Sequence, residues 1–378
     1  MSKLRCVPGG RLRLAVIGVG HLGKIHARLT RQLDGVELVG VVDPSPEARA
    51  AAQAELGAAA HADHQPLLGQ IDAAIIATPT RLHHAVAHDL LVHGVHVFVE
   101  KPVTLNVADA DDLIQAAEDR GLVLQVGHVE RFNPALVAAL PHLAEPKYID
   151  ANRCGPYSCR STDVGVVLDL MIHDIDVALS LVEGELAGVS ALGAAVIGPN
   201  EDWAQARLTF AGGCVVNLSA SRVAWQAART MQVVCCDSIA AIDFGTRKSQ
   251  VMRPTDAILS GELDVQSLGP AERAHLKDHL FTEYLPLAEL PVGEANALVD
   301  EQREFVAAIR GETAVRVNGR DGRRALDVAE RILAEIAAHR WDGTAVGPIG
   351  PRFETRESVL RGPHWQQSRR AVVRRKAG

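Results

Sequence analysis

One apolar segment of the chain carries side chains suited to moving a proton. The stretch GVVLDLMIHDID, residues 165–176, is apolar almost all round, yet it contains Asp169, His173 and Asp176. In a helix this spacing places all three side chains on one face. An imidazole titrates near neutral pH, so a histidine beside a carboxylate suits general acid–base chemistry. The alternative is that these are buried polar groups whose partners lie elsewhere in the core.

Three glycines have the spacing of a phosphate-binding turn. VIGVGHLG contains Gly18-x-Gly20-x-x-Gly23, directly after an expected strand and at the start of an expected helix. Gly18 permits the tight turn, Gly20 lets backbone approach a pyrophosphate, and Gly23 allows close packing of helix on strand. The free N–H groups at the helix N-terminus would face the phosphates. We therefore expect a dinucleotide site.

The next expected strand indicates which dinucleotide is bound. It ends in Asp43, where the ribose-binding carboxylate of such folds lies. Pro44 and Ser45 follow, and no adjacent arginine is available for a 2′-phosphate. This favours NAD as the cofactor and leaves NADP possible, because Arg49 is near enough in sequence to reach the ribose.

A lysine follows a later strand. VFVEKPVTLN, residues 97–106, ends an expected strand with Glu100-Lys101-Pro102. Ligands of open α/β sheets bind at the carboxyl ends of the strands, so Lys101 is placed to reach into a cofactor crevice. Taken singly, it is equally compatible with an ordinary surface lysine.

The expected elements that position these residues show two different patterns of apolar residues along the chain. Up to about residue 128, short Val/Ile/Ala-rich runs alternate with amphipathic stretches, which is typical of a parallel sheet covered on both faces. Beyond residue 130, alternating segments such as AQARLTFAGGCVVNLSASRV indicate a mostly antiparallel sheet, with a hairpin turn at 210–214. We predict an N-terminal α/β doubly wound Rossmann domain and a C-terminal α+β domain with a mixed sheet. The expected division is an extension 1–10, a Rossmann domain 11–130, a substrate and oligomerisation domain 131–344, and a basic tail 345–378.

Composition narrows the class of protein. The chain has 378 residues, 47% of them hydrophobic and 22% charged, as in an ordinary two-domain globular protein. The formal net charge of −7 argues against a nucleic-acid partner. No apolar run is long enough for a transmembrane segment. The six cysteines have no Cys-x-x-Cys spacing, so we expect reduced thiols, no metal site and a cytoplasmic location.

The three motifs together resemble those of the Gfo/Idh/MocA oxidoreductases. The resemblance covers about residues 11–340 and rests on the glycine turn, on Glu100-Lys101-Pro102 and on Asp169-x-x-x-His173, in the family's order. It implies that Lys101, Asp169 and His173 are catalytic and converge beside the nicotinamide. It also implies a homo-oligomer, dimer or tetramer, formed through the open sheet face. The cofactor contacts expected from it and from the glycine turn are Gly18, Gly20, His21, Leu22, Gly23, Asp43, Thr78, Pro79, Glu100 and Lys101.

Local features indicate a nucleotide-sugar substrate. VGHVERFNP, residues 126–134, places Arg131 and Asn133 after a strand of the first domain, and Arg222 lies on a strand of the second. With Met171, where many family members have glycine, these features resemble the subgroup of UDP-N-acetylglucosamine 3-dehydrogenases. That subgroup makes a 3-keto sugar for an amino sugar of lipid A. A diphosphate needs cations, and the candidates are Arg131, Arg153, Arg160 and Arg222. Each is equally compatible with a structural arginine paired with a carboxylate. The predicted substrate residues are Arg131, Asn133 and Arg222.

Other functions stay open at this point. One is a dehydrogenase of a free sugar or inositol, or a bilin reductase. Another, from a different class, is a non-catalytic dinucleotide-sensing regulator, which the same fold hosts. Loss of the lysine or the histidine would mark a regulator, and both are present.

Overall fold

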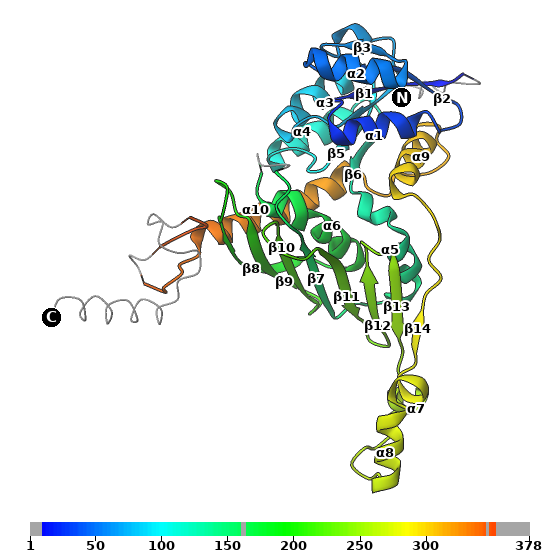
Figure 1. The fold of residues 1–378 in the computed structure, drawn as a ribbon, viewed down its shortest axis with the longest axis vertical. Helices are drawn as coiled ribbons and strands as arrows, with labels where there is room; N and C mark the ends of the chain where they lie inside the picture. The colour runs from blue at the N-terminus through cyan, green and yellow to red at the C-terminus, as the bar shows by residue number, and fades with distance from the viewer. Residues whose placement is uncertain (1–9, 160–163, 345–347, 353–378) are drawn as a thin grey trace, which may run out of the picture. The chain divides into compact units, whose positions relative to one another are not determined.

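The computed structural model describes residues 10–159, 164–344 and 348–352. It divides into two compact units, described here by residue range (Figure 1). The first unit runs to Ala138 and takes in Pro291–Asp327, and the second holds Ala139–Leu290 and the chain from Val328 onward. The expected N-terminal extension up to residue 9 and most of the expected basic tail lie outside the described residues.

The first unit contains a six-stranded sheet in which every pair of neighbours is parallel. Its order, β3-β2-β1-β4-β5-β6, reverses direction between β1 and β4, which is the switch point where doubly wound sheets bind ligands. The Rossmann prediction is confirmed, although β3 was not predicted. The strands are β1 Leu12–Ile17, β2 Val36–Val42, β3 Ala59–His61, β4 Ala73–Ile76, β5 His96–Glu100 and β6 Leu124–Gly127.

Helices with clear start signals cover this sheet. Ser45 caps α2 through a 3.1 Å bond from the Ala48 amide, and Pro46 follows as its first residue. Asn106 caps α4 in the same way through Asp109. The helices of the first unit are α1 His21–Thr30, α2 Pro46–Leu56, α3 His83–Val92, α4 Val107–Glu118, α5 Pro134–Ala139 and α9 Ala297–Ile309.

The return of the chain to the first unit differs from the expected division at residue 131. Val299, Phe305 and Val306 of α9 are buried in one cluster with strand residues that include Phe98 of β5. The Phe98 and Phe305 ring centroids lie 5.8 Å apart. This shared apolar burial places α9 with the first sheet, although it follows the second sheet in sequence.

The second unit contains an eight-stranded mixed sheet of order β14-β13-β12-β11-β7-β10-β9-β8. Only β7 and β10 are parallel neighbours among the described pairs, which confirms the mostly antiparallel prediction. The predicted hairpin joins β9 to β10. The strands are β7 Tyr148–Cys154, β8 Leu186–Ala194, β9 Trp203–Phe210, β10 Val215–Ser221, β11 Ala228–Val234, β12 Ile239–Asp243, β13 Lys248–Met252 and β14 Leu287–Glu289.

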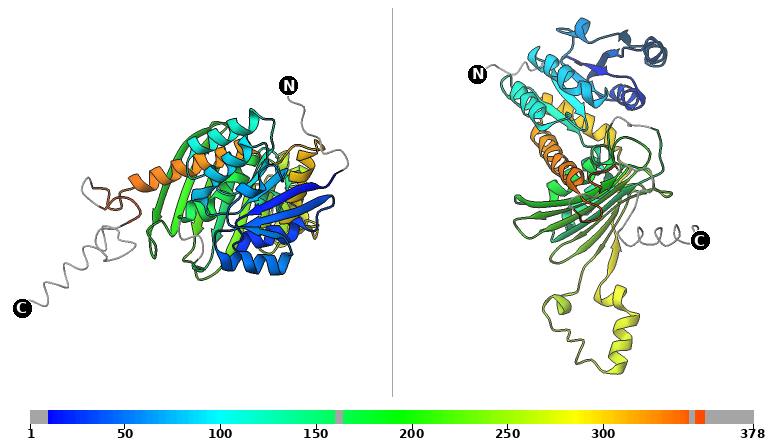
Figure 2. Two further views of the ribbon diagram at one scale, coloured as in Figure 1. Left: turned by 90° about the horizontal axis from the view of Figure 1, so that it is seen from above. Right: turned by 90° about the vertical axis from the view of Figure 1, so that its left-hand side faces the viewer.

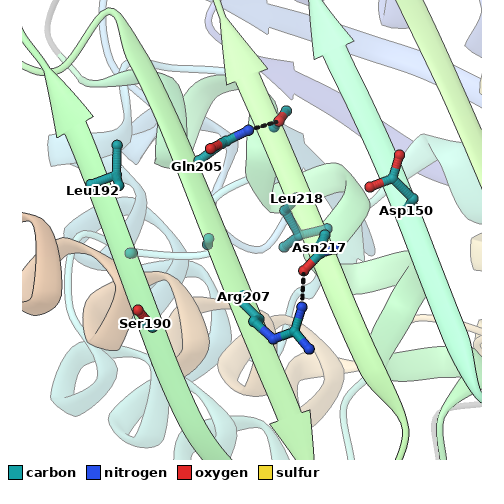
Figure 3. A pocket seen from close by; sticks show the side chains of 10 residues that line it. Asp150, Ser190, Leu192, Gln205, Arg207, Asn217 and Leu218 are labelled. Carbon is teal, nitrogen blue, oxygen red and sulfur yellow. Dashed lines mark hydrogen bonds between the residues drawn. The ribbon is translucent and has the colours of Figure 1, made fainter. Parts of the chain in front are cut away.

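The two faces of this sheet differ in polarity. Ala206, Leu208 and Leu218 are buried on the face that packs on helix α6, Ile172–Leu181. The opposite face carries a shallow hollow in which Gln205 donates to Ser219 at 3.2 Å and Arg207 to Asn217 at 3.3 Å (Figure 3). This alternation of apolar and polar residues is that of a sheet with one solvated face.

Further helices complete the second unit. The long α10, Gly319–Ala338, begins in the first unit and ends in the second, and it buries an apolar stripe at Leu326, Ala329, Ile332 and Ile336. Between β13 and β14 the chain forms a projection containing α7 Asp256–Leu259, α8 Pro270–Asp278 and the π turn η6 Leu280–Tyr284 (Figures 1 and 2). Among the described residues, no helix is long and apolar enough to cross a membrane.

Candidate active site

The glycine turn after β1 has the geometry that a dinucleotide requires. Gly18 has φ +89°, and a Cβ built on Gly23 would lie 1.8 Å from the Gly18 carbonyl oxygen, so a side chain is excluded there. A Cβ on Gly20, in contrast, would meet nothing within 4 Å. The helix therefore packs tightly on the strand while open space remains above Gly20, as approach of a pyrophosphate to the backbone demands.

The first helix leaves its N-terminus available to an anion. Gly20 is the N-cap of α1 and offers no side chain to cap it. Exposed His21 and half-buried Leu22 form its first turn. Uncapped N–H groups with the positive end of the helix dipole fit the phosphates of NAD.

Asp43 lies at the end of β2 and is held by backbone. Its Oδ2 accepts from the Val19 amide at 3.0 Å and its Oδ1 from the Ser45 amide at 2.9 Å. Each oxygen keeps a second lone pair for a ribose hydroxyl. Arg49, the residue that left NADP open, donates to the carbonyl oxygens of Asp43 and Pro44 at 2.8 and 3.0 Å. Its guanidinium is thus partly engaged, in agreement with the preference for NAD.

His83 is a buried histidine that was not predicted to belong to the site. It contacts the turns that follow β4 and β5. His83 places one ring nitrogen 2.9 Å from the Thr78 carbonyl oxygen and the other 2.9 Å from that of Pro102. Burial lowers the pKa of His83, and the hydrogen bonds to the two carbonyl oxygens oppose that shift. The Thr78 hydroxyl, beside exposed Pro79, is buried and has no hydrogen-bond partner among the described residues. A buried orphan hydroxyl after β4 fits a cofactor contact.

Glu100, at the end of β5, is anchored below the turn that carries Lys101. Gln302 lies 2.7 Å from His26 Nδ1 through its amide nitrogen, and its Oε1 accepts from Thr30, so His26 is left to donate through Nε2. That Nε2 lies 2.6 Å from Glu100 Oε1. Lys101 is half-buried, and its peptide bond to Pro102 is cis.

A second glutamate lies against this anchor. Glu301 of α9 is fully buried, and neither carboxylate oxygen has a hydrogen-bond partner among the described residues. Burial, then the nearby charges of Glu100 and Glu304, raise the pKa of Glu301 well above its ordinary value. Burial therefore favours the protonated form of Glu301.

In the second unit, the segment with Asp169 and His173 is helical, but it begins differently from the prediction. Residues Val167–Met171 form the π turn η5, and α6 continues from Ile172. Such turns occur often at functional sites, and the apolar pattern does not distinguish them from an α-helix. From residue 164 to 179, the only residues that are not buried are Asp169, Leu170 and His173. Met171 is fully buried, so it does not line this accessible strip.

Asp176, the third polar residue of this face, is 1% exposed, so it is a buried polar group, the alternative that the sequence left open. Asp174, on the same apolar helix, is an acid with a structural role. Arg153 of β7 donates to both Asp174 oxygens, from Nε at 2.9 Å and from Nη2 at 2.8 Å. The acids of this helix thus include a structural ion pair besides the accessible Asp169.

Glu201 holds the start of this helix and was also missed from sequence. Its Oε1 accepts from the Val167 amide at 3.2 Å, and its carbonyl oxygen accepts from Val166 at 3.0 Å. A Cβ on Gly165 would lie 1.9 Å from Glu201 Oε1, so only glycine leaves room for the carboxylate. The two residues lie far apart in sequence, and nothing in the local pattern around either of them indicates the contact.

The predicted substrate residues have structural contacts of their own. Arg222 is buried, donates to Asp202 at 2.6 Å and to the Val164 carbonyl at 2.9 Å, and lies over the Tyr157 ring. Asn133 donates to Glu130 and caps the following turn through the Ala135 amide. Arg131 is half-buried on a short turn after β6. Of the three, Arg131 is the one that is not buried. Arg160 lies outside the described residues.

The predicted site residues are thus divided between the units. The cofactor residues and Arg131 and Asn133 belong to the first unit, with the cofactor residues following β1, β2, β4 and β5. Asp169, His173 and Arg222 belong to the second unit. These arrangements define an NAD-binding dehydrogenase whose second unit presents a histidine and a carboxylate on one helix.

Comparison with known proteins agrees with this class. The family model described as "Oxidoreductase family, NAD-binding Rossmann fold" matches residues 12–128, and the "GFO/IDH/MocA C-terminal domain" matches 147–238. The chain belongs to the Gfo/Idh/MocA family of oxidoreductases.

Relatives in this family act on sugars and cyclitols. The chain is 35% identical, over 86% of its length and 98% of the relative's, to UDP-N-acetylglucosamine 3-dehydrogenase of Acidithiobacillus ferrooxidans. A solved structure of that enzyme has a TM-score of 0.75 at 34% identity, covering 86% of this chain and 97% of the other. Scyllo-inositol 2-dehydrogenase (NAD⁺) of Bacillus subtilis is 30% identical over 56% of this chain and 68% of its own.

Proposed function

We propose that the protein oxidises the C3 hydroxyl of UDP-N-acetylglucosamine to the 3-keto sugar, with NAD as the oxidant. The observation that carries the chemistry is the accessible strip of Asp169 and His173 on an otherwise buried helix. The similarity to the A. ferrooxidans enzyme, which spans nearly all of that relative, supports the choice of substrate. Oxidation at C3 creates the carbonyl that a later transamination needs, which fits a role in lipid A amino-sugar synthesis.

The reaction removes a hydride from C3 and a proton from its oxygen. NAD, when bound at the glycine turn, accepts the hydride. We assign His173 as the general base that takes the hydroxyl proton. Lys101 stabilises the developing alkoxide by its positive charge. Asp169, one turn earlier on the helix, orients the imidazole or accepts a hydrogen bond from a neighbouring sugar hydroxyl.

The diphosphate of the substrate requires a cation. We assign this role to Arg131, because the guanidinium of Arg222 is already occupied by Asp202 in the interior. Arg222 and Asn133 then act indirectly, by holding the loops on which they lie. An Arg131→Ala variant should raise KM for the nucleotide sugar more than tenfold while changing kcat little.

The first experiment identifies the substrate. Purified protein is incubated with NAD or NADP and with UDP-N-acetylglucosamine, glucose or myo-inositol, and products are analysed by mass spectrometry as well as cofactor absorbance. A product lighter than UDP-N-acetylglucosamine by two hydrogen atoms supports the proposal. Turnover of a free polyol alone would instead favour an inositol dehydrogenase, the alternative that the inositol-specific relatives represent.

The second experiment tests the catalytic residues. Lys101→Ala and His173→Ala should each lower kcat by about 10²–10⁴-fold, because each removes charge or proton transfer from the reacting centre. NADH binding, measured by fluorescence, should stay near that of the wild type. Exposed Lys248→Ala and His93→Ala serve as matched controls. Wild-type turnover in either test variant contradicts the assignment of that residue.

A further inference from the structure

The projection between β13 and β14, residues 253–286, has no interior of its own. We call it the arm (Figure 2). Every one of its residues is described, and none is buried. Its apolar Leu259 and Phe281 are 52% and 59% exposed. Segments of this size that cannot bury a core are usually held together by a cross-link, a metal or a partner.

The arm carries three metal-ligating side chains where α8 passes into the π turn η6: His275 lies in α8, His279 is its C-cap, and Glu283 lies in η6. The His279 amide donates to the His275 carbonyl at 2.9 Å, and the Glu283 amide donates to that of His279 at 2.9 Å. The three side chains therefore follow one another along one helix face. One ligand atom from each of His275, His279 and Glu283 lies within 4.8 Å of the others.

The hydrogen bonds of the two imidazoles leave suitable nitrogens for a metal. His279 Nδ1 lies 3.0 Å from the His275 carbonyl oxygen, so it donates there and its Nε2 carries the lone pair. His275 Nδ1 lies 3.4 Å from the Tyr284 hydroxyl, and its Nε2 is 3.8 Å from Glu283 Oε2. Bonds at Nδ1 that orient a ring and free Nε2 are the usual support of a histidine ligand.

We propose that His275, His279 and Glu283 bind a zinc-class divalent ion that clamps the arm. Two imidazole nitrogens and a carboxylate suit Zn²⁺, with water as the fourth ligand, whereas Mg²⁺ and Ca²⁺ prefer oxygen donors alone. Binding joins two helical turns and so replaces the missing apolar interior. The site is separate from the catalytic assignment and does not depend on the proposed substrate.

A half-buried histidine pair provides a comparison. His84 and His88 are also four residues apart on a helix, but both direct Nε2 at Asp112, at 2.7 and 3.7 Å. Their ring centroids are 5.8 Å apart and tilted, whereas those of His275 and His279 are 4.1 Å apart and stacked. His26, Glu100 and Glu301 form a second group of possible metal ligands, and it is buried. There His26 Nε2 is hydrogen-bonded to Glu100 Oε1, so neither atom is available to a metal ion.

Calorimetric titration of the chelator-treated full-length protein with ZnCl₂ tests the proposal. We expect one equivalent to bind with a micromolar dissociation constant, and the double variant His275→Ala/His279→Ala to weaken it more than tenfold. The control His84→Ala/His88→Ala should bind as the wild type does. Unchanged binding in the arm variant, loss only in the control, or millimolar binding in the wild type would each overturn the proposal.

Proteolysis gives a second readout that does not depend on the calorimetric signal. Arg273 and Lys277 are exposed on α8 beside the ligands and are trypsin sites. Zn²⁺ should slow cleavage there several-fold in the wild type, and Mg²⁺ should not. In the arm variant Zn²⁺ should have no effect. Equal protection of the variant would show that the ion acts elsewhere and would refute the clamp.

Discussion

Two buried ion pairs of the second unit contrast with two buried glutamates of the first. In the second unit, Asp174 is paired with Arg153 and Asp202 with Arg222, and all four side chains are at most 7% exposed. In the first unit, Glu100 is hydrogen-bonded by His26, and Glu301 has no hydrogen-bond partner among the described residues. Asp174 and Asp202 are therefore satisfied by full opposite charges, whereas Glu100 accepts from an imidazole and burial favours the protonated form of Glu301.

We relate this difference to the part of the site that each unit positions: the helix with His173 in the second unit, and the cofactor turn in the first. The ion pair at Asp174 joins the helix that carries His173 to strand β7, so its directional, two-bond geometry fixes the helix. The acids of the first unit lie beneath a turn that approaches a dinucleotide carrying its own negative charge. A protonated Glu301 adds no further negative charge there, at the cost of a group that is sensitive to pH.

Breaking the pair in the second unit should have the largest effect on stability. Asp174→Asn leaves the Arg153 charge buried, so we expect a loss of about 3–5 kcal/mol in the free energy of unfolding, measured with urea. The double variant Arg153→Met/Asp174→Leu should recover most of it, because it leaves no unpaired charge. Exposed Arg207→Ala is the control. A loss below about 1 kcal/mol in Asp174→Asn would show that the pair does not anchor the helix.

His96, on strand β5 of the first unit, should give the next largest effect. Burial lowers the pKa of His96 to about 4. The unfolded chain binds a proton near pH 6.5 and the folded chain does not, so this stability is present above pH 6.5 and is lost as pH falls toward 4. The contribution is roughly 3 kcal/mol.

His96→Gln should remove that loss while keeping an acceptor for the Val123 amide, which donates to His96 Nδ1 at 2.9 Å. Urea unfolding of the variant and wild type at pH 7.5 and 4.5 measures the difference. Exposed His93→Gln should not change the pH dependence. Equal slopes for wild type and His96→Gln would mean that His96 titrates normally.

The sequence was sufficient wherever a local pattern determines the structure. The glycine turn, Asp43 and Lys101 each follow a strand whose apolar run is unambiguous, and the motif itself specifies the turn. Asp169 and His173 were found in the same way, because polar residues in an apolar helix stand out.

Contacts between distant segments could not be predicted. Arg222 was predicted to bind a diphosphate, but it forms an ion pair with Asp202, which lies 20 residues away in sequence. The residues next to Arg222 do not indicate whether it pairs with a carboxylate or binds a ligand. The π turn at 167–171 and the return of α9 to the first sheet depend on packing that no local window contains. The arm could not be predicted from an apolar pattern, because none of its residues is buried.

The smallest expected effect concerns Glu301 and sharpens the comparison most. The raised pKa means that the folded chain keeps a proton that the unfolded chain releases above about pH 4.3. The stability that this proton allows is complete below that pH and declines as pH rises toward the folded pKa. Glu301→Gln mimics the neutral acid, so it should be stabilising relative to wild type at pH 8 and nearly neutral at pH 4.

Urea unfolding at the two pH values measures this, with exposed Glu312→Gln as the control. If Glu301→Gln instead destabilises the protein equally at both pH values, Glu301 is ionised and has a partner that the described contacts do not include. The two units would then handle their buried acids alike. If the variant gains stability with pH as expected and keeps wild-type kcat, the proton on Glu301 serves the fold beneath the cofactor turn and takes no part in catalysis.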